Sequence, residues 1–190
     1  GQIKGNGTLT TYIHNNSPEI DSQRKRPAIL VCPGGGYGHV SDREAEPVAM
    51  RFLSAGFNVF VLKYEVAPKV KHPQPLFDVS RAVWIIRENA AQWNVKSDQI
   101  IVCGFSAGGH LAASLGVFWK EEYISREIGM TSGMNQPNAL ILSYPVIVSG
   151  ENAHRGSFVN LLGETAPEEM LEKMSLEKQV SGNTPPRSEE

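Results

Sequence analysis

The sequence predicts an α/β domain in which a mostly parallel, twisted sheet carries helices on both faces. Short apolar runs alternate along the chain with stretches that have helical spacing of apolar residues, the pattern of a parallel sheet with helical crossovers. The runs are continuous, as expected of strands buried on both faces. We find no internal repeat in the 190 residues and therefore expect a single domain over residues 1–190.

The elements follow in order along the chain. Alternation over residues 8–13 predicts an outer strand. Continuous apolar runs predict four buried strands, at residues 28–32, 57–62, 99–103 and 138–142. Helical spacing predicts three helices, at residues 44–55, 76–93 and 107–119. The polar tail, residues 182–190, predicts no regular structure.

Composition narrows the class of function. The formal net charge is −2 without a basic stripe, so we set nucleic-acid binding aside. The apolar runs are too short to span a bilayer, so we expect no membrane partner. Residues 1–5 do not resemble a signal peptide, but they leave a removed secretion signal open. Cys32 and Cys103 each end an apolar run and predict buried free thiols, and the default location is then the cytoplasm.

The sharpest motif is Gly104-Phe105-Ser106-Ala107-Gly108, directly after a predicted strand and before a predicted helix. This is the setting of a nucleophile elbow, in which a serine hydroxyl projects above the sheet from a tight turn. Gly104 and Gly108 fit because side chains there would collide with neighbouring backbone. The sequence therefore predicts Ser106 as a catalytic nucleophile.

A second motif, the glycine run Gly34, Gly35 and Gly36, follows the predicted strand at 28–32. Acyl transfer needs backbone N–H donors for the oxyanion. We expect one donor from Ala107 and the others from this run. A phosphate-binding loop is the competing interpretation, but neither the P-loop nor the dinucleotide-binding spacing is present.

These motifs resemble the α/β-hydrolase superfamily and, more narrowly, small esterases of the acetyl-xylan esterase-like or lipase-like kind. The resemblance rests on residues 31–37, 75–79 and 104–112, and on 142–145 continuing to 183–186. It implies hydrolysis of short acyl esters, including acetyl groups on carbohydrates. It also implies a small-molecule ester as partner and no metal or organic cofactor.

The resemblance further implies a catalytic acid and a histidine on later strands. Here residues 183–186 lead directly to Arg187-Ser188-Glu189-Glu190, so both partners are absent from this chain. We therefore expect a fold that is C-terminally incomplete by two strands and a poorly active esterase. We also expect a bare apolar edge at residues 138–142 through which the chain self-associates. A non-catalytic binding module and a prolyl-oligopeptidase-type peptidase remain alternatives, although the peptidase's propeller domain is missing.

None of the five histidines occupies the family position. We expect His14 at the surface, His72 in a proline-rich loop, His110 packed beside Ser106 and His154 in a region over the site, which leaves His39 as the candidate for a substitute base. Helix-start roles are expected for the carboxylates of Asp78, Glu44 and Glu46. Tyr37 and Tyr64 suit either core packing or an acyl or sugar pocket.

Overall fold

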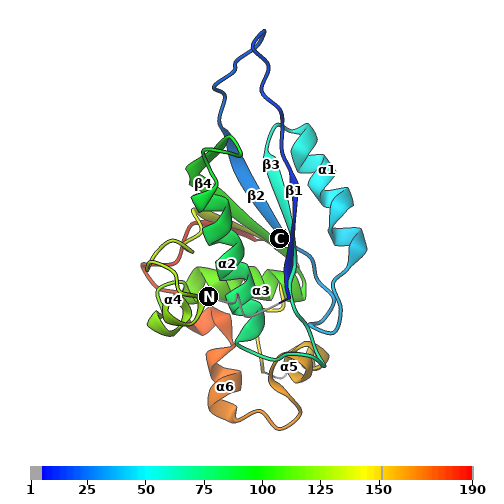
Figure 1. The fold of residues 1–190 in the computed structure, drawn as a ribbon. Helices are drawn as coiled ribbons and strands as arrows, with labels where there is room; N and C mark the ends of the chain where they lie inside the picture. The colour runs from blue at the N-terminus through cyan, green and yellow to red at the C-terminus, as the bar shows by residue number, and fades with distance from the viewer. Residues whose placement is uncertain (1–5, 151, 190) are drawn as a thin grey trace.

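The computed structural model describes residues 6–150 and 152–189, and the signal-peptide prediction for residues 1–5 lies outside them. One six-stranded sheet has the order β1-β3-β2-β4-β5-β6. Its strands are β1 (Thr8–Tyr12), β2 (Arg26–Cys32), β3 (Asn58–Lys63), β4 (Val95–Phe105), β5 (Ala139–Ser143) and β6 (Arg187–Glu189). β1 pairs antiparallel with β3, and the remaining pairs are parallel. The predicted mostly parallel sheet is therefore confirmed (Figure 1).

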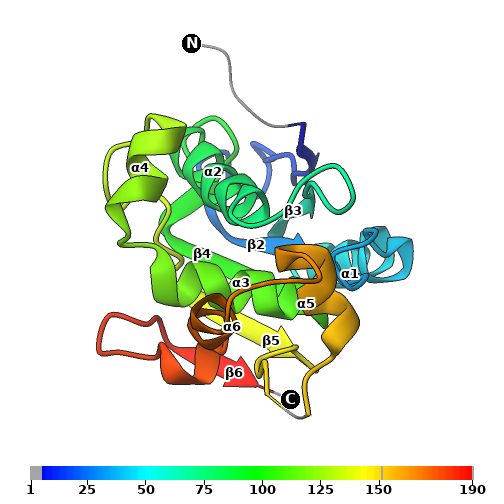
Figure 2. The ribbon, with the colours of Figure 1, turned by 90° about the horizontal axis from the view of Figure 1, so that it is seen from below.

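The helices cover both faces of this sheet (Figures 1 and 2). They are α1 (Glu46–Ser54), α2 (Gln74–Glu88), α3 (Ala107–Phe118), α4 (Glu122–Ile128), α5 (Arg155–Leu162) and α6 (Glu168–Lys173), with short 3-10 helices η1 (Asp42–Glu44) and η2 (Leu176–Lys178). α1 packs on one face, whereas α2 and α3 pack on the other. The predicted layers are therefore present, and α4, α5, α6 and both 3-10 helices were not foreseen.

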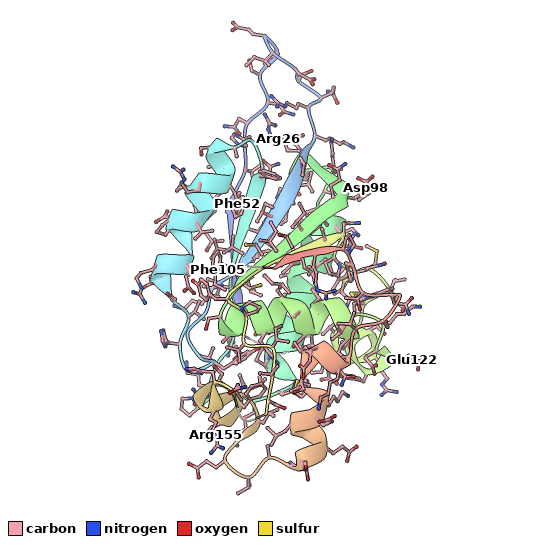
Figure 3. The ribbon with its side chains drawn as sticks, turned by 180° about the vertical axis from the view of Figure 1, so that it is seen from behind. Arg26, Phe52, Asp98, Phe105, Glu122 and Arg155 are labelled. Atoms are coloured by element: carbon pink, nitrogen blue, oxygen red, sulfur yellow. The ribbon has the colours of Figure 1, made fainter. Side chains whose placement is uncertain are left out.

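Alternate residues of each central strand point to opposite faces. Ile29 and Val31 of β2 face the α1 side, where Phe52 packs (Figure 3). Leu30 of β2 instead joins the larger core under α2 and α3. Because all three strand side chains are fully buried, a continuous apolar run is what this strand requires.

Helix α2 ends at Glu88 and not at residue 93 as predicted. The side-chain amide of Asn89 donates to the carbonyl of Ile85 at 2.8 Å and closes the last turn. The chain then turns through Asn94, which has a positive φ of 54°. Trp93, expected at the end of the helix, instead packs against Phe60 of β3 with ring centroids 5.3 Å apart.

The prediction of a tail without regular structure over residues 182–190 is wrong for residues 187–189. Residues Arg187–Glu189 form β6, which pairs in parallel with β5. The N–H of Leu140 donates to the carbonyl of Pro186 at 2.9 Å. A polar sequence can form an edge strand because pairing uses backbone groups, which every non-proline residue carries. β5 is therefore not the bare edge that the sequence predicted.

Candidate active site

Ser106 occupies the turn between the end of β4 and the start of α3. Its backbone has φ 51° and ψ −119°, a region that residues other than glycine adopt only under constraint. Two hydrogen bonds supply that constraint: Ser106 N–H donates to the carbonyl of Ser143 at 3.1 Å, and Val146 N–H donates to the carbonyl of Ser106 at 3.1 Å. The end of β5 and the loop that follows it thus hold the N–H and the carbonyl of Ser106.

The glycines around Ser106 allow backbone segments to approach closely. A Cβ at Gly104 would lie 2.2 Å from the carbonyl oxygen of Gly108. A Cβ at Gly108 would lie 2.1 Å from the carbonyl oxygen of Cys32. Both distances are far inside van der Waals contact, which confirms the steric reason given for glycine at these two positions.

The glycine loop, defined here as residues 33–37, lies directly against the Ser106 turn. A Cβ at Gly34 would be 2.8 Å from the carbonyl oxygen of Phe105 and 3.0 Å from Cβ of Ser106. Gly35 and Gly36 have positive φ values of 128° and 62°. This loop follows β2 and the Ser106 turn follows β4. Since β2 and β4 are neighbouring parallel strands, their carboxyl ends meet at one edge of the sheet.

The N–H group of Gly34 is already engaged. It donates to Oε2 of Glu44 at 2.6 Å, so the prediction that Gly34 contributes an oxyanion donor is wrong for this arrangement. Gly35 and Gly36 line the same cleft as Ser106. Ala107 begins α3, and its N–H therefore has no carbonyl one turn back within the helix. Of the backbone N–H groups predicted to bind the oxyanion, those of Gly35, Gly36 and Ala107 therefore stay predictions.

The cleft at Ser106 has a volume of about 450 Å³. Its walls combine the glycine loop with Tyr144 from the loop after β5. Polar side chains dominate the rest of the lining: His39, Ser41, Arg43, Glu44, His154 and Asn160. Asn160 of α5 donates to the carbonyl of Gly36 at 2.8 Å, which ties α5 to the glycine loop. The cleft is open, polar and of a size that suits a small ligand.

Two histidines, His39 and His154, line this cleft. Within the described ranges, no hydrogen bond joins the Ser106 hydroxyl to either ring. His154 precedes α5, and its Nδ1 lies 2.9 Å from Oγ of Ser157. The sequence singled out His39 alone as a substitute base, and the structure brings both histidines to the same cleft.

Two of the other histidines, His110 and His14, make contacts within the fold. His110 is 1% exposed; its Nδ1 lies 2.8 Å from the Tyr37 hydroxyl and its Nε2 lies 3.0 Å from the carbonyl oxygen of Met174. Burial lowers the pKa of His110 to about 4. His14 is half-buried rather than at the surface, with Nε2 at 2.9 Å from the carbonyl of Leu53. The expected packing role of His110 is confirmed.

The two tyrosines belong to the core. Tyr37 and Tyr64 are each 2% exposed, with their rings edge to face at 6.0 Å. The Tyr64 hydroxyl donates to the carbonyl of Pro33 at 2.7 Å. Burial raises the pKa of both hydroxyls. Of the two alternatives left by the sequence, core packing beneath the glycine loop is the one observed.

The carboxylates of Asp78 and Glu44 lie in different surroundings. Asp78 accepts from the Glu65 N–H at 2.8 Å and from Nε2 of Gln74 at 2.9 Å, and burial raises its pKa. This agrees with a structural role. Glu44 lies in η1 and contacts both the glycine loop and Tyr144. Sequence reasoning missed the latter contact, since Tyr144 lies 100 residues further along the chain.

Cys32 and Cys103 are buried free thiols, as predicted. Burial raises the pKa of both, that of Cys103 to about 12. In the described part of the chain, no group of three or more His, Cys, Asp or Glu side chains could hold a metal ion. Among the same residues, no helix combines the length and the apolar character needed to span a bilayer.

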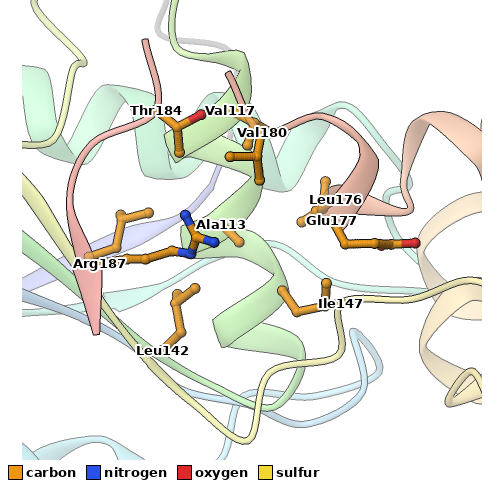
Figure 4. Close-up of a pocket in the computed structure, with 10 residues that line it drawn as sticks. Ala113, Val117, Leu142, Ile147, Leu176, Glu177, Val180, Thr184 and Arg187 are labelled. Atoms are coloured by element: carbon orange, nitrogen blue, oxygen red, sulfur yellow. The ribbon is translucent and has the colours of Figure 1, made fainter. Parts of the chain in front are cut away.

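A second cavity, of about 140 Å³, lies between α3, β5 and the segment that ends in β6 (Figure 4). Its lining is mostly apolar, with Leu142, Ile147, Leu176 and Val180 beside the polar Arg187. It shares no lining residue with the Ser106 cleft. The residues singled out from the sequence, Ser106 and the glycine loop, lie at the other cleft.

The sheet, the strained serine between β4 and α3 and the glycine loop after β2 define an α/β-hydrolase. The BD-FAE family model matches residues 16–187, and the chain belongs to that family.

Several known proteins are similar to this chain. It is 42% identical over 182 residues to endo-1,4-beta-xylanase B of Butyrivibrio fibrisolvens, an alignment that covers 94% of this chain and 27% of that protein. It is 34% identical over 149 residues to an acetylxylan esterase of Xylanibacter ruminicola, covering 77% and 28%. The crystal structure of an acetyl ester-xyloside bifunctional hydrolase from Caldicellulosiruptor lactoaceticus superposes with a TM-score of 0.81 at 37% identity, covering 95% and 64%. The chain thus spans less than two thirds of each.

Proposed function

We propose that this chain carries the nucleophile and the oxyanion-binding groups of a serine ester hydrolase. One observation carries the proposal: Ser106, held in a strained turn, opens onto the same cleft as Gly35 and Gly36. A hydroxyl in this setting can approach an ester carbonyl while backbone N–H groups receive the carbonyl oxygen. The esterases among the similar proteins support the same reaction.

In the proposed reaction, Oγ of Ser106 attacks the ester carbonyl carbon and forms a tetrahedral intermediate. The oxygen that becomes negative accepts hydrogen bonds from Ala107 and from Gly35 or Gly36, and the positive end of the α3 dipole adds to this stabilisation. The alcohol then leaves, and water hydrolyses the acyl-serine. A base must take the proton from Ser106 during attack and return one to the leaving alcohol.

We expect slow turnover from the 190-residue chain by itself. His39 and His154 reach the cleft, but neither is hydrogen-bonded to Ser106 within residues 6–150 and 152–189. A serine hydrolase site without its base keeps only about 10³–10⁴-fold catalysis over water, from the oxyanion donors and binding. For the substrate we propose short acyl esters, acetyl esters of carbohydrates in particular. The polar lining from Arg43, His154 and Asn160 suits the hydroxyl groups of a sugar.

The test is hydrolysis of p-nitrophenyl acetate by the chain beside its Ser106→Ala variant. Intact-mass measurement of both proteins after exposure to an activated phosphonate ester runs in parallel. A rate and a covalent adduct that both require Ser106 support the proposal. Equal rates and no adduct on Ser106 would instead favour the non-catalytic binding module. If the rate depends on Ser106, the variants His39→Ala and His154→Ala identify which ring serves as base.

A further inference from the structure

The carboxylate of Glu44 joins the two loops that enclose Ser106. Oε2 accepts the N–H of Gly34 at 2.6 Å, and Oε1 accepts the hydroxyl of Tyr144 at 2.8 Å. Gly34 belongs to the glycine loop after β2, and Tyr144 belongs to the loop after β5. One side chain from η1 therefore bridges the glycine loop and the loop after β5.

The segment around η1 binds Gly34 through both of its backbone polar groups. Glu44 accepts the N–H of Gly34, and the N–H of Ser41 donates to the carbonyl of Gly34 at 2.9 Å. At 2.6 Å the contact from Gly34 is shorter than the usual N–H···O hydrogen bond of about 2.9–3.0 Å. The backbone of Gly34 is thus fixed immediately before Gly35 and Gly36, the two glycines that line the cleft.

The Tyr144 end of the bridge is equally well anchored. Ser143 and Val146, which flank Tyr144, hold the backbone of Ser106 through the two 3.1 Å hydrogen bonds. The Tyr144 ring lies against Phe105, with centroids 5.9 Å apart. Glu44 therefore links the glycine loop to the loop after β5, which also contacts Ser106.

We propose that Glu44 is a positioning residue: it fixes the peptide of Gly34 and thereby orients the N–H groups of Gly35 and Gly36 toward the oxyanion. This inference rests on the proposed function of Ser106. A misplacement of donors by about 1 Å reduces rates by about 100-fold in enzymes, so the effect falls on kcat. Glu44 also lines the cleft, but both of its carboxylate oxygens already accept hydrogen bonds, from Gly34 and from Tyr144, so we expect substrate affinity to change little.

The matched control is Glu46, two residues away, which accepts a 3.3 Å hydrogen bond from the Tyr12 hydroxyl. We expect Glu44→Ala to lower the Ser106-dependent kcat about 10- to 100-fold with KM within about 3-fold. Glu46→Ala should leave both constants unchanged. Glu44→Gln should recover kcat to within about 3-fold, since an amide oxygen can accept from Gly34 while the amide nitrogen donates to Tyr144. Tyr144→Phe should lower kcat by less than Glu44→Ala.

A measurement without turnover separates this inference from the proposed function. In ¹⁵N-labelled full chain, the amide signals of Gly35 and Gly36 should move in Glu44→Ala and stay in place in Glu46→Ala. Unmoved signals, or a Glu44→Gln variant as slow as Glu44→Ala, overturn the positioning role. If wild type shows no Ser106-dependent rate, the proposed function fails for this chain and the amide signals still decide the role of Glu44. Should Glu44→Ala not fold, Glu44→Gln and Tyr144→Phe supply the same comparison.

Discussion

The hydroxyl of Tyr37 donates a hydrogen bond to Nδ1 of His110 across 2.8 Å. The donor role of the tyrosine follows from the other ring nitrogen, since Nε2 faces the carbonyl oxygen of Met174 at 3.0 Å and must carry the proton. The ring is thereby held in one neutral tautomer. This pair ties the glycine loop to α3 and to the segment after α6 beneath the Ser106 cleft.

The stability of the protein should fall as pH drops from about 6.5 to about 4. Burial lowers the folded-state pKa of His110 and of His72 to about 4, whereas an unfolded histidine has a pKa of about 6.5. Between these values the unfolded chain binds more protons, so unfolding becomes easier at lower pH. Each histidine contributes at most about 1.4 kcal/mol per pH unit.

Urea unfolding at pH 7 and at pH 5 measures this slope for wild type and for His110→Gln. We expect a flatter slope in the variant. Wild type and variant must be compared because Asp78 also contributes to the slope. Its raised pKa makes the folded state more stable as pH falls, which is opposite to the effect of the histidines. Equal slopes would show that His110 is not held neutral.

Replacing Ser106 by glycine should stabilise the fold relative to Ser106→Ala. The φ of 51° at this position costs a non-glycine residue on the order of 1–3 kcal/mol, while glycine loses about 0.5–1 kcal/mol through the entropy of the unfolded chain. We expect a net difference of about 1 kcal/mol in the free energy of unfolding, read from urea midpoints. Equal stability of the two variants would mean that the turn stores no strain.

Alanine at Gly104 should be strongly destabilising, because its Cβ would meet the carbonyl oxygen of Gly108 at 2.2 Å. Forcing atoms into packed backbone costs about 1–3 kcal/mol or more. The control is Gly182→Ala, where nothing lies within 4 Å of the added Cβ. Thermal unfolding of both variants gives the comparison, and a Gly104→Ala protein as stable as Gly182→Ala contradicts the close approach.

Disrupting β6 should increase self-association. Ser188 is the middle residue of β6 and pairs with Ile141 of β5; proline there removes an N–H donor, whereas alanine keeps it. We expect Ser188→Pro to expose the β5 edge and raise the mean molar mass in light scattering, with Ser188→Ala unchanged. No difference between these two variants would show that β6 does not protect the edge.

The fold was largely predictable because continuous apolar runs coincide with strands buried on both faces. Residues 28–32 became β2 almost unchanged. Boundaries set by side-chain hydrogen bonds were not predictable: Asn89 ends α2 five residues early by binding the carbonyl of Ile85. β6 escaped prediction since an edge strand needs backbone groups from a partner and little apolar surface of its own.

The residues of the candidate site also fall into some that the sequence predicted and some that it did not. Ser106, Gly104 and Gly108 were found because their spacing reflects local backbone sterics within one turn. The role of Glu44 depends on Gly34, 10 residues earlier, and on Tyr144, 100 residues later. Only the folded sheet brings these three residues together. A sequence motif covers a short stretch of the chain and therefore could not predict this contact.

The parallel pairing of β2 with β4 also bears on how Ser106 acquires its special geometry. The pairing aligns Ala28 with Ile100 and Cys32 with Gly104, residues some seventy positions apart, and the loop after β5 must then dock to lock the turn. The positive φ at Ser106 is held in the folded state by contacts with segments far away in the sequence. The backbone conformation of this serine is therefore a property of the assembled sheet, and the residues next to it in the chain do not fix it alone.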